Sequence, residues 1–203
     1  DRDEMNFLLR YLRPEDSFLD IGANIGVYTL LAASKIKSGL IHSFEVLPKN
    51  YERLQENLKL NQFDRVKTYE VAIANFTGEI SLNLAEGDSM PFITPNANDK
   101  TINVPTDTLD NLLEDRSLEN LTLAKIDIEG AEILAFKGAT SLLKQQRPYV
   151  WILEINDAVN NFGHQQQDVV NLLKDYGYGL YHYDADTNEL NQISVDQKRG
   201  NNV

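Results

Sequence analysis

The sequence predicts an α/β fold built on an open, doubly wound and mostly parallel sheet, and three observations support this prediction. Short apolar runs alternate with amphipathic helical patterns along the chain. A glycine-rich turn, Gly22 to Gly26, joins the first apolar run to the first helical pattern. The two most apolar runs, Leu121 to Ile128 and Tyr149 to Ile155, have the composition of central strands that are buried on both faces.

The first part of the chain predicts two complete β-α units. The first strand begins at Phe18, ends in the carboxylate of Asp20 and precedes an amphipathic helical pattern. The second, Gly39 to Val46, precedes a helix that Pro48 opens. Val66 to Ile73 is expected to form a third strand. This succession is typical of a parallel sheet, because parallel neighbours need a crossover connection between them.

The rest of the chain continues the alternation and ends in an antiparallel hairpin. A segment rich in Pro, Asn, Asp and Ser, Glu86 to Lys100, is expected to be a surface loop or a lid. The other expected elements are strands at Glu79 to Leu84 and Ile102 to Pro105, helices at Leu109 to Leu113, Ala131 to Gln146 with a break near Gly138, and Asp168 to Tyr176, and hairpin strands at Gly179 to Tyr183 and Glu189 to Ser194.

The composition is that of one ordinary soluble domain, expected to span residues 1–203. The chain is 42% hydrophobic and 25% charged, and it has no cysteine for disulfides, thiolate catalysis or cysteine zinc sites. It contains no apolar run of about 18 residues and no signal-peptide pattern, so a cytoplasmic protein without membrane contact is expected. A net charge of −12 and a pI near 4.6 disfavour nucleic acid as a partner, because phosphate binding needs clustered Lys and Arg.

The glycine-rich turn predicts a ligand with a nucleotide-like part. Gly22 and Gly26 let a ligand approach the backbone, and the free amides at the start of the helix offer a partly positive surface. The dinucleotide fingerprint is Gly-x-Gly-x-x-Gly, whereas this chain has Asp-x-Gly-x-x-x-Gly beginning at Asp20. The spacing therefore favours S-adenosylmethionine (SAM) over a nicotinamide cofactor.

Four acids stand at or near the carboxyl ends of expected strands, where ligands of such sheets bind: Asp20, Glu45, Asp127 and Glu154. Glu45 follows Asp20 by 25 positions and ends the second strand. A carboxylate there can accept hydrogen bonds from both ribose hydroxyls of an adenosyl group. Glu45 is therefore the expected ribose ligand.

Several of these segments resemble the FkbM-type SAM-dependent methyltransferases. The resemblance covers roughly residues 5 to 182, and its most specific part is the run Lys125 to Glu132, Lys-Ile-Asp-Ile-Glu-Gly-Ala-Glu. The other segments that carry it are Phe18 to Tyr28, Phe44-Glu45 and Thr108-Leu109-Asp110. It implies a Rossmann-like class I methyltransferase fold and methyl transfer, usually to a hydroxyl of a sugar or of a polyketide, peptide or lipid scaffold.

The expected cofactor site combines the glycine turn with three strand ends. Asp20 is expected to hold the amino group of the methionine moiety, directly or through water, and Asn24 to cap the first helix as well as line the pocket. The third strand has no acid after it for adenine, so backbone groups near Ala72 or the Asn75 side chain are expected to serve. The full expected set is Asp20, Gly22, Ala23, Asn24, Gly26, Glu45, Val46, Ala72 and Asp127.

A hydroxyl acceptor needs a base, because it is a poor nucleophile until its proton leaves. The candidates are Asp127, which is expected nearest the reacting methyl group, and Glu129, Glu154 and His164; each also has a structural reading, such as a helix cap or a solvated loop residue. For Glu132 the structural and functional readings stay open. Lys125 is expected to be a partly buried lysine paired with an acid. Asp127, Glu154 and Asn156 offer oxygen ligands for Mg²⁺, but no metal is expected.

Other functions are weighed against O-methyl transfer to a small-molecule or glycan acceptor. A nicotinamide dehydrogenase would need a third glycine, and a nucleic-acid amino-methyltransferase would need an Asp/Asn-Pro-Pro-aromatic motif where this chain has Asp127 to Gly130. A protein or small-molecule N-methyltransferase and a noncatalytic SAM-binding module stay open. The acids Asp127 and Glu154 favour an enzyme over the latter.

Overall fold

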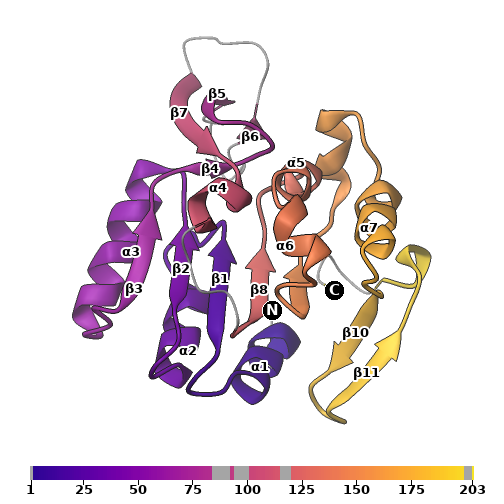
Figure 1. Ribbon diagram of the computed structural model, residues 1–203, viewed down its shortest axis with the longest axis horizontal. Helices are drawn as coiled ribbons and strands as arrows, with labels where there is room; N and C mark the ends of the chain where they lie inside the picture. Colours follow the sequence, from indigo (N-terminus) through magenta and orange to yellow (C-terminus); the bar gives the residue numbers. More distant parts are fainter. Residues whose placement is uncertain (1, 84–91, 94–100, 115–119, 199–202) are drawn as a thin grey trace.

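A five-stranded parallel sheet forms the centre of the molecule (Figure 1). The computed structural model describes residues 2–83, 92–93, 101–114, 120–198 and 203. The strand order is β3-β2-β1-β8-β9, and every neighbouring pair is parallel. The order reverses direction between β1 and β8, which is the switch point at which ligands of such sheets bind. The bounds are β1 Ser17–Ile21, β2 Ile41–Phe44, β3 Val66–Tyr69, β8 Leu121–Ile126 and β9 Val150–Leu153.

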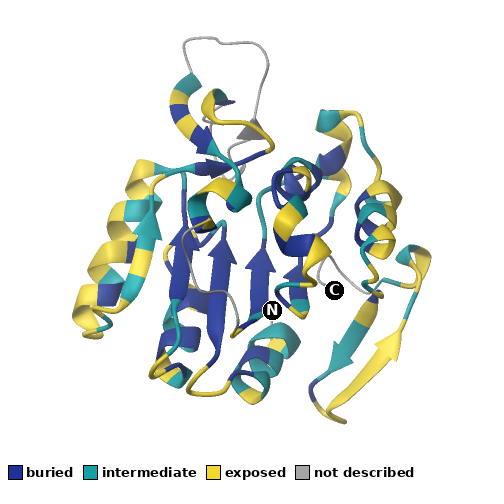
Figure 2. Ribbon diagram, viewed as in Figure 1, coloured by how far each residue is buried: buried dark blue, intermediate teal, exposed yellow. Residues whose placement is uncertain are grey.

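Helices cover both faces of this sheet, so the predicted doubly wound α/β architecture is confirmed. Side chains alternate along β1: Phe18 packs in one apolar cluster with Leu8 and Tyr28, while Leu19 and Ile21 pack in a second one. Both faces of the central strands are buried (Figure 2). On the first face lie α1 Arg2–Tyr11, α2 Val27–Lys35 and α3 Pro48–Leu60; on the second lie α4 Leu109–Leu113, α5 Glu132–Lys137, α6 Thr140–Lys144 and α7 Gln166–Asp175.

A second, smaller sheet lies beyond the carboxyl ends of the central strands, at the top of Figure 1. Its order is β4-β7-β5-β6, with β4 Ala72–Ile73, β5 Gly78–Asn83, β6 Phe92–Ile93 and β7 Thr101–Asp107. The prediction of one strand over Val66 to Ile73 is wrong. The chain leaves the central sheet after Tyr69, because Ala72 and Ile73 pair with Thr106 and Asp107 of β7 instead.

The chain closes with the predicted antiparallel hairpin, β10 Tyr181–Asp184 and β11 Glu189–Gln192. The break of the predicted long helix at Gly138 is also confirmed, since α5 and α6 lie on either side of it. Four elements had no prediction: α1, the 3-10 turns η1 Asp157–Phe162 and η2 Val195–Gln197, and the strand β6, which pairs with β5 inside the segment expected to be a loop. Most of the expected loop Glu86 to Lys100, and Leu84 of an expected strand, fall outside the described residues.

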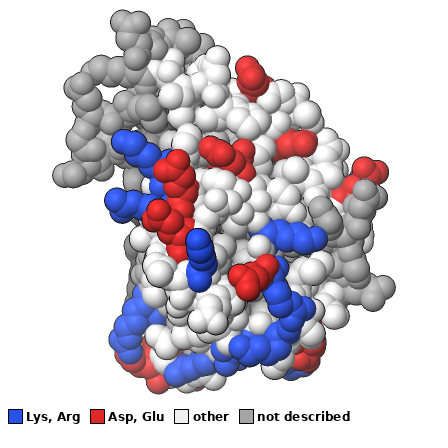
Figure 3. All heavy atoms as spheres, turned by 90° about the vertical axis from the view of Figure 1, so that its left-hand side faces the viewer, with Lys and Arg blue, Asp and Glu red and all other residues white. Residues whose placement is uncertain are grey.

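Acidic and basic side chains are intermingled on the side of the molecule that carries α3 (Figure 3). The sequence of α3 itself places Lys49, Glu52, Arg53, Glu56 and Lys59 on one short helix. Within the described ranges, no helix has the length and apolar character that crossing a bilayer requires.

The helix α1 is expected to belong to the folding unit, because Leu8 is 0% exposed and packs against Phe18. Replacing Leu8 by Ala should lower the free energy of unfolding by about 2–5 kcal/mol, from lost burial and the cavity left behind. Leu60→Ala is the matched control, since Leu60 is 78% exposed; it should change stability by less than about 0.5 kcal/mol. Denaturant unfolding measures both, and equal effects would contradict the packing of α1.

Candidate active site

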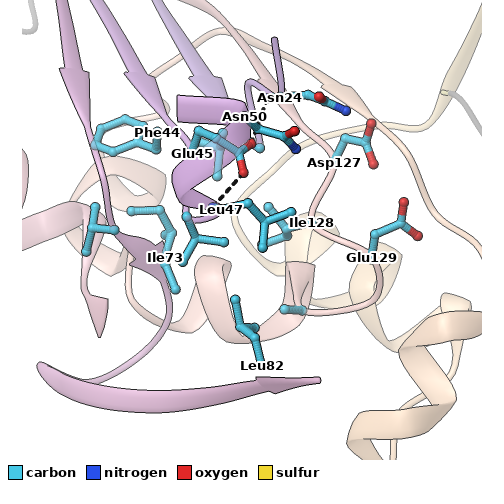
Figure 4. A pocket seen from close by; sticks show the side chains of 16 residues that line it. Asn24, Phe44, Glu45, Leu47, Asn50, Ile73, Leu82, Asp127, Ile128 and Glu129 are labelled. Carbon is cyan, nitrogen blue, oxygen red and sulfur yellow. Dashed lines mark hydrogen bonds between the residues drawn. The ribbon is translucent and has the colours of Figure 1, made fainter. Parts of the chain in front are cut away.

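A pocket opens at the carboxyl ends of β1, β2 and β8, at the predicted edge of the sheet (Figure 4). Its empty space is about 780 Å³, a volume that includes the open solvent at its mouth. The lining residues come from the glycine turn, the end of β2, the start of α3, the region of β4 and β5, and the turn after β8: Ile21, Gly22, Asn24, Phe44, Glu45, Val46, Leu47, Asn50, Val71, Ala72, Ile73, Leu82, Asp127, Ile128, Glu129 and Ala131.

The glycine turn is clamped between β2 and the segment after β8. The amides of Gly22 and Ala23 both donate to the carbonyl oxygen of Phe44, at 2.9 Å. Gly22 has a φ of +79°, and a Cβ there would lie 1.9 Å from the carbonyl oxygen of Asp127. Only glycine fits this position, because both the positive φ and the close approach exclude a side chain.

Glu45 faces the pocket and ties the glycine turn to β2. Its Oε2 accepts a hydrogen bond from the amide of Asn24 at 2.7 Å, and its Oε1 accepts one from the amide of Leu47 at 2.8 Å. The side chain is buried, and this burial raises the pKa of Glu45 although the two amides act against the shift. Each carboxylate oxygen can accept a further hydrogen bond, which leaves acceptor capacity for ligand hydroxyls.

Asn24 lines the pocket but does not cap α2, the helix that follows the glycine turn, so that part of its prediction is wrong. The N-cap of α2 is Gly26, without a side-chain capping bond. Asn24 has a φ of +52° and Gly26 one of +93°. These two left-handed residues turn the chain so that α2 begins beyond Asn24, whose side chain is left to line the pocket.

Asp20 is fully buried beneath the glycine turn. Its Oδ2 accepts a hydrogen bond from the hydroxyl of Thr29 at 2.5 Å, whereas no described group donates to its Oδ1. Burial raises the pKa of Asp20, and the charge of Lys125 acts in the opposite direction. A buried carboxylate oxygen without a donor is unfavourable, so this atom suits a ligand ammonium group or a bridging water.

Lys125 and Asp127 form the ion pair that the sequence predicts for Lys125. The Lys125 Nζ lies 2.9 Å from Asp127 Oδ2 and 4.9 Å from the centre of the Tyr28 ring. The Lys125 side chain is 7% exposed and that of Asp127 is 25% exposed. The lysine therefore lies under the pocket, while its partner carboxylate reaches the pocket rim.

The turn after Asp127 carries two acids with different environments. Glu129 lines the pocket with a φ of +52°. Burial and the charge of Asp127 raise its pKa, against a hydrogen bond with Asn156. Glu132 is buried, and its Oε1 accepts from the amides of Ile128 and Gly130 at 3.2 Å. Burial raises the pKa of Glu132 to about 7. The structural reading of Glu132 thus has direct support, because it holds the turn.

The structure places Glu154 and His164 outside the pocket lining. Glu154 directly follows β9, and its amide donates to the carbonyl of Ile126. The His164 ring lies between α5 and α7, with Nε2 3.4 Å from Lys137 Nζ and Nδ1 3.8 Å from Asp168 Oδ2. In the part of the chain that the structure describes, no three His, Cys, Asp or Glu side chains are grouped as metal ligands.

Sequence reasoning missed much of the apolar wall opposite Asp127 and Glu129. Val71, Ala72, Ile73 and Leu82 line the pocket, and Figure 4 shows Ile73 and Leu82 on this side of it. The apolar run around Ala72 was a sequence signal that could have identified Val71 and Ile73. Leu82 had none, because it belongs to β5 and reaches the pocket only through pairing within the smaller sheet.

The chain matches the model of the Methyltransferase FkbM domain over residues 20–180. It belongs to the FkbM methyltransferase family. The match covers every lining residue of the pocket and the run Lys125 to Glu132. The predicted resemblance is thereby confirmed.

Proteins similar to this chain include "Methyltransferase 1" of Beauveria bassiana, which is 29% identical over 149 residues, or 62% of this chain. Hexuronic acid methyltransferase AglP of Haloferax volcanii is 27% identical over 184 residues, 86% of this chain, and 2-O-methyltransferase NoeI of Sinorhizobium fredii is 27% identical over 152 residues, 66% of this chain. This chain spans 59%, 68% and 62% of the lengths of these three relatives.

Two solved structures share the fold of this FkbM domain. An rRNA methylase from Streptococcus thermophilus has a TM-score of 0.53 at 14% identity, over 89% of this chain and 84% of that one. A precorrin-6y C5,15-methyltransferase from Geobacter metallireducens has a TM-score of 0.52 at 16% identity, over 90% and 73%. The fold is therefore that of class I methyltransferases, as predicted.

The buried Glu132 is expected to make stability depend on pH. Its folded pKa of about 7 lies above the ordinary value of 4.5, so its favourable contribution is complete below pH 4.5 and is lost as pH rises through 7. Glu132→Gln keeps an acceptor for the two amides without the charge. Relative to this variant, the wild type should lose roughly 3 kcal/mol between these pH values. Parallel stability curves from denaturant unfolding would contradict the burial argument.

Proposed function

We propose that this protein is a SAM-dependent O-methyltransferase that acts on a hydroxyl of a sugar or natural-product acceptor. The observation that carries the proposal is the Glu45 carboxylate, which directly follows β2 and faces the pocket. It stands beside a glycine turn whose sequence lacks the dinucleotide spacing. Membership of the FkbM methyltransferase family supports methyl transfer. The similarity to AglP, a hexuronic acid methyltransferase, supports a sugar acceptor, and the similarity to NoeI, a 2-O-methyltransferase, supports transfer to oxygen.

The residues present fit the cofactor from end to end. Glu45 accepts the ribose hydroxyls, and the apolar wall of Val71, Ala72 and Leu82 accommodates the adenine ring. The donorless Oδ1 of Asp20 suits the ammonium of the amino-acid end. Since Asp20 does not line the pocket, a water molecule bridges its carboxylate and the ammonium group of SAM in this proposal.

SAM held by these residues would supply a methyl group on a sulfonium for transfer to the acceptor oxygen, with S-adenosylhomocysteine as the leaving group. The protein's own contribution is to align the acceptor and to accept its proton. Asp127 and Glu129 carry the carboxylates on the side of the pocket away from the apolar wall (Figure 4). The raised pKa of Glu129 makes it the better proton acceptor of a pair in which Asp127 orients the acceptor hydroxyl.

Glu45→Ala should weaken SAM binding by roughly 10- to 100-fold, because hydrogen bonds to a charged acceptor contribute about 1.5–3 kcal/mol. Isothermal titration calorimetry with SAM measures the dissociation constant. Glu56→Ala on the exposed side of α3 is the control and should bind SAM like the wild type. An unchanged dissociation constant in Glu45→Ala would refute the ribose assignment.

Asp127→Asn and Glu129→Gln should each lower turnover by about 100-fold or more while changing SAM affinity by only a few-fold. Glu129 as proton acceptor and Asp127 as the group that orients the acceptor hydroxyl both act in the transition state. Transfer of a radiolabelled methyl group to a panel of sugar, lipid and polyketide hydroxyls identifies the acceptor and gives the rates. Glu70→Gln, an exposed acid after β3, is the control. Full turnover in both variants would exclude these carboxylates from the reaction. The same assay with added chelator tests whether the reaction requires a metal ion.

A further inference from the structure

Lys125 lies between two acids of the site, the buried Asp20 and the pocket residue Asp127. In the parallel pairing of β1 with β8, Lys125 lies directly opposite Asp20. Register partners on neighbouring strands point to the same face of a sheet, which here is the face that α2 covers with Tyr28 and Thr29. From this buried place the lysine reaches towards the strand end, where its Nζ meets Asp127 Oδ2 at 2.9 Å.

One positive charge therefore serves two carboxylates. The charge of Lys125 attracts both the Asp20 and the Asp127 carboxylates, whereas these two carboxylates repel each other. The other ionisable groups of the described chain that act on this cluster are Tyr28 on α2, Glu45 after β2, Glu129 after β8 and Glu132 on α5; Tyr28 in turn interacts with Glu4 on α1 and Glu154 after β9. None of them is a cation, so Lys125 is the counter-charge of the cluster.

We propose that Lys125 is a positioning residue that keeps Asp20 charged to receive the ammonium end of SAM and holds Asp127 in place at the acceptor side of the pocket. This role rests on the proposed function, because it assumes that SAM occupies the pocket. Without the lysine, two carboxylates with no counter-charge share a buried site, and such a site favours uptake of a proton. The proton would go to the buried Asp20, which then loses its attraction for an ammonium group.

Asp127 is affected in a different way. The hydrogen bond from Lys125 fixes one of its two oxygens, so that the other is presented at the rim. When this bond is lost, the carboxylate can rotate and the acceptor hydroxyl loses a fixed partner. Lys125 therefore acts on both SAM affinity and turnover, through two different carboxylates.

A purely structural lysine and a positioning lysine predict different pH behaviour. If Lys125 only fills space, its removal weakens SAM binding by the same factor at every pH. If it keeps Asp20 charged, the loss is largest at low pH and recovers as pH rises. The pH must stay below ~7.7–8.0, where an α-amino group loses its own proton.

The test is calorimetric titration of SAM between pH 5.5 and 7.5 into the wild type, Lys125→Met, Lys125→Gln and Lys125→Arg. For the Met and Gln variants, the pH at which SAM affinity reaches a given fraction of its maximum should lie about 1–3 units above that of the wild type. The reason is that one close opposite charge usually shifts the pKa of a carboxyl group by this much. The Arg variant should restore the wild-type profile. The Gln variant keeps a hydrogen-bond donor for Asp127 and serves as the test if the Met variant does not fold. Thermal unfolding shows whether each variant is folded.

Asp20→Asn supplies the matched control. In this background Lys125→Gln should no longer change the pH profile of SAM affinity, because the carboxyl group that the lysine keeps charged is gone. Affinity curves of Lys125→Gln and wild type that run parallel at all pH values would overturn the proposal. A wild type that binds SAM normally, with such parallel curves, refutes only the role of Lys125; a wild type that binds no SAM refutes the proposed function and this role together.

Discussion

The pocket depends on one carboxylate that joins two separate strand ends. Glu45 accepts the amide of Asn24 from the glycine turn and the amide of Leu47 from its own segment. These two hydrogen bonds fix the turn that follows β1 against the end of β2, and the close contact of Gly22 with the Asp127 backbone fixes it against β8. Three strand ends thus form one rigid rim, which is the kind of support that a binding site requires.

Electrostatics divides this rim into two functional parts. The Glu45 part combines a buried carboxylate with backbone amides and an apolar wall, and it suits a neutral polar group such as a ribose with its adjoining ring. The other part gathers Asp20, Asp127 and Glu129 around a single buried lysine. Its excess of negative charge suits a cationic cofactor and the uptake of a proton from the acceptor. The same chain segment, Lys125 to Glu132, supplies most of the second part.

The sequence predicts the elements whose signals are local. The turn from Gly22 to Gly26, the acid at Glu45 and the run Lys125 to Glu132 all lie on short segments with distinctive residue types, and each lines or supports the pocket. The predictions that failed depend on distant partners. Val66 to Ile73 reads as one strand, yet β7 draws Ala72 and Ile73 into another sheet. Leu82 reaches the pocket in the same way, and Asn24 lost its capping role because two left-handed residues delay the helix.

The most direct test of the central claim is a crystal structure of the protein with S-adenosylhomocysteine, the product form of the cofactor. The account predicts ribose hydroxyls within about 3.2 Å of the Glu45 oxygens, with the adenine ring against Ala72 and Leu82. Density for the nucleoside at any other site, or a pocket that stays empty at saturating ligand while Glu45 keeps its amide contacts, would contradict it.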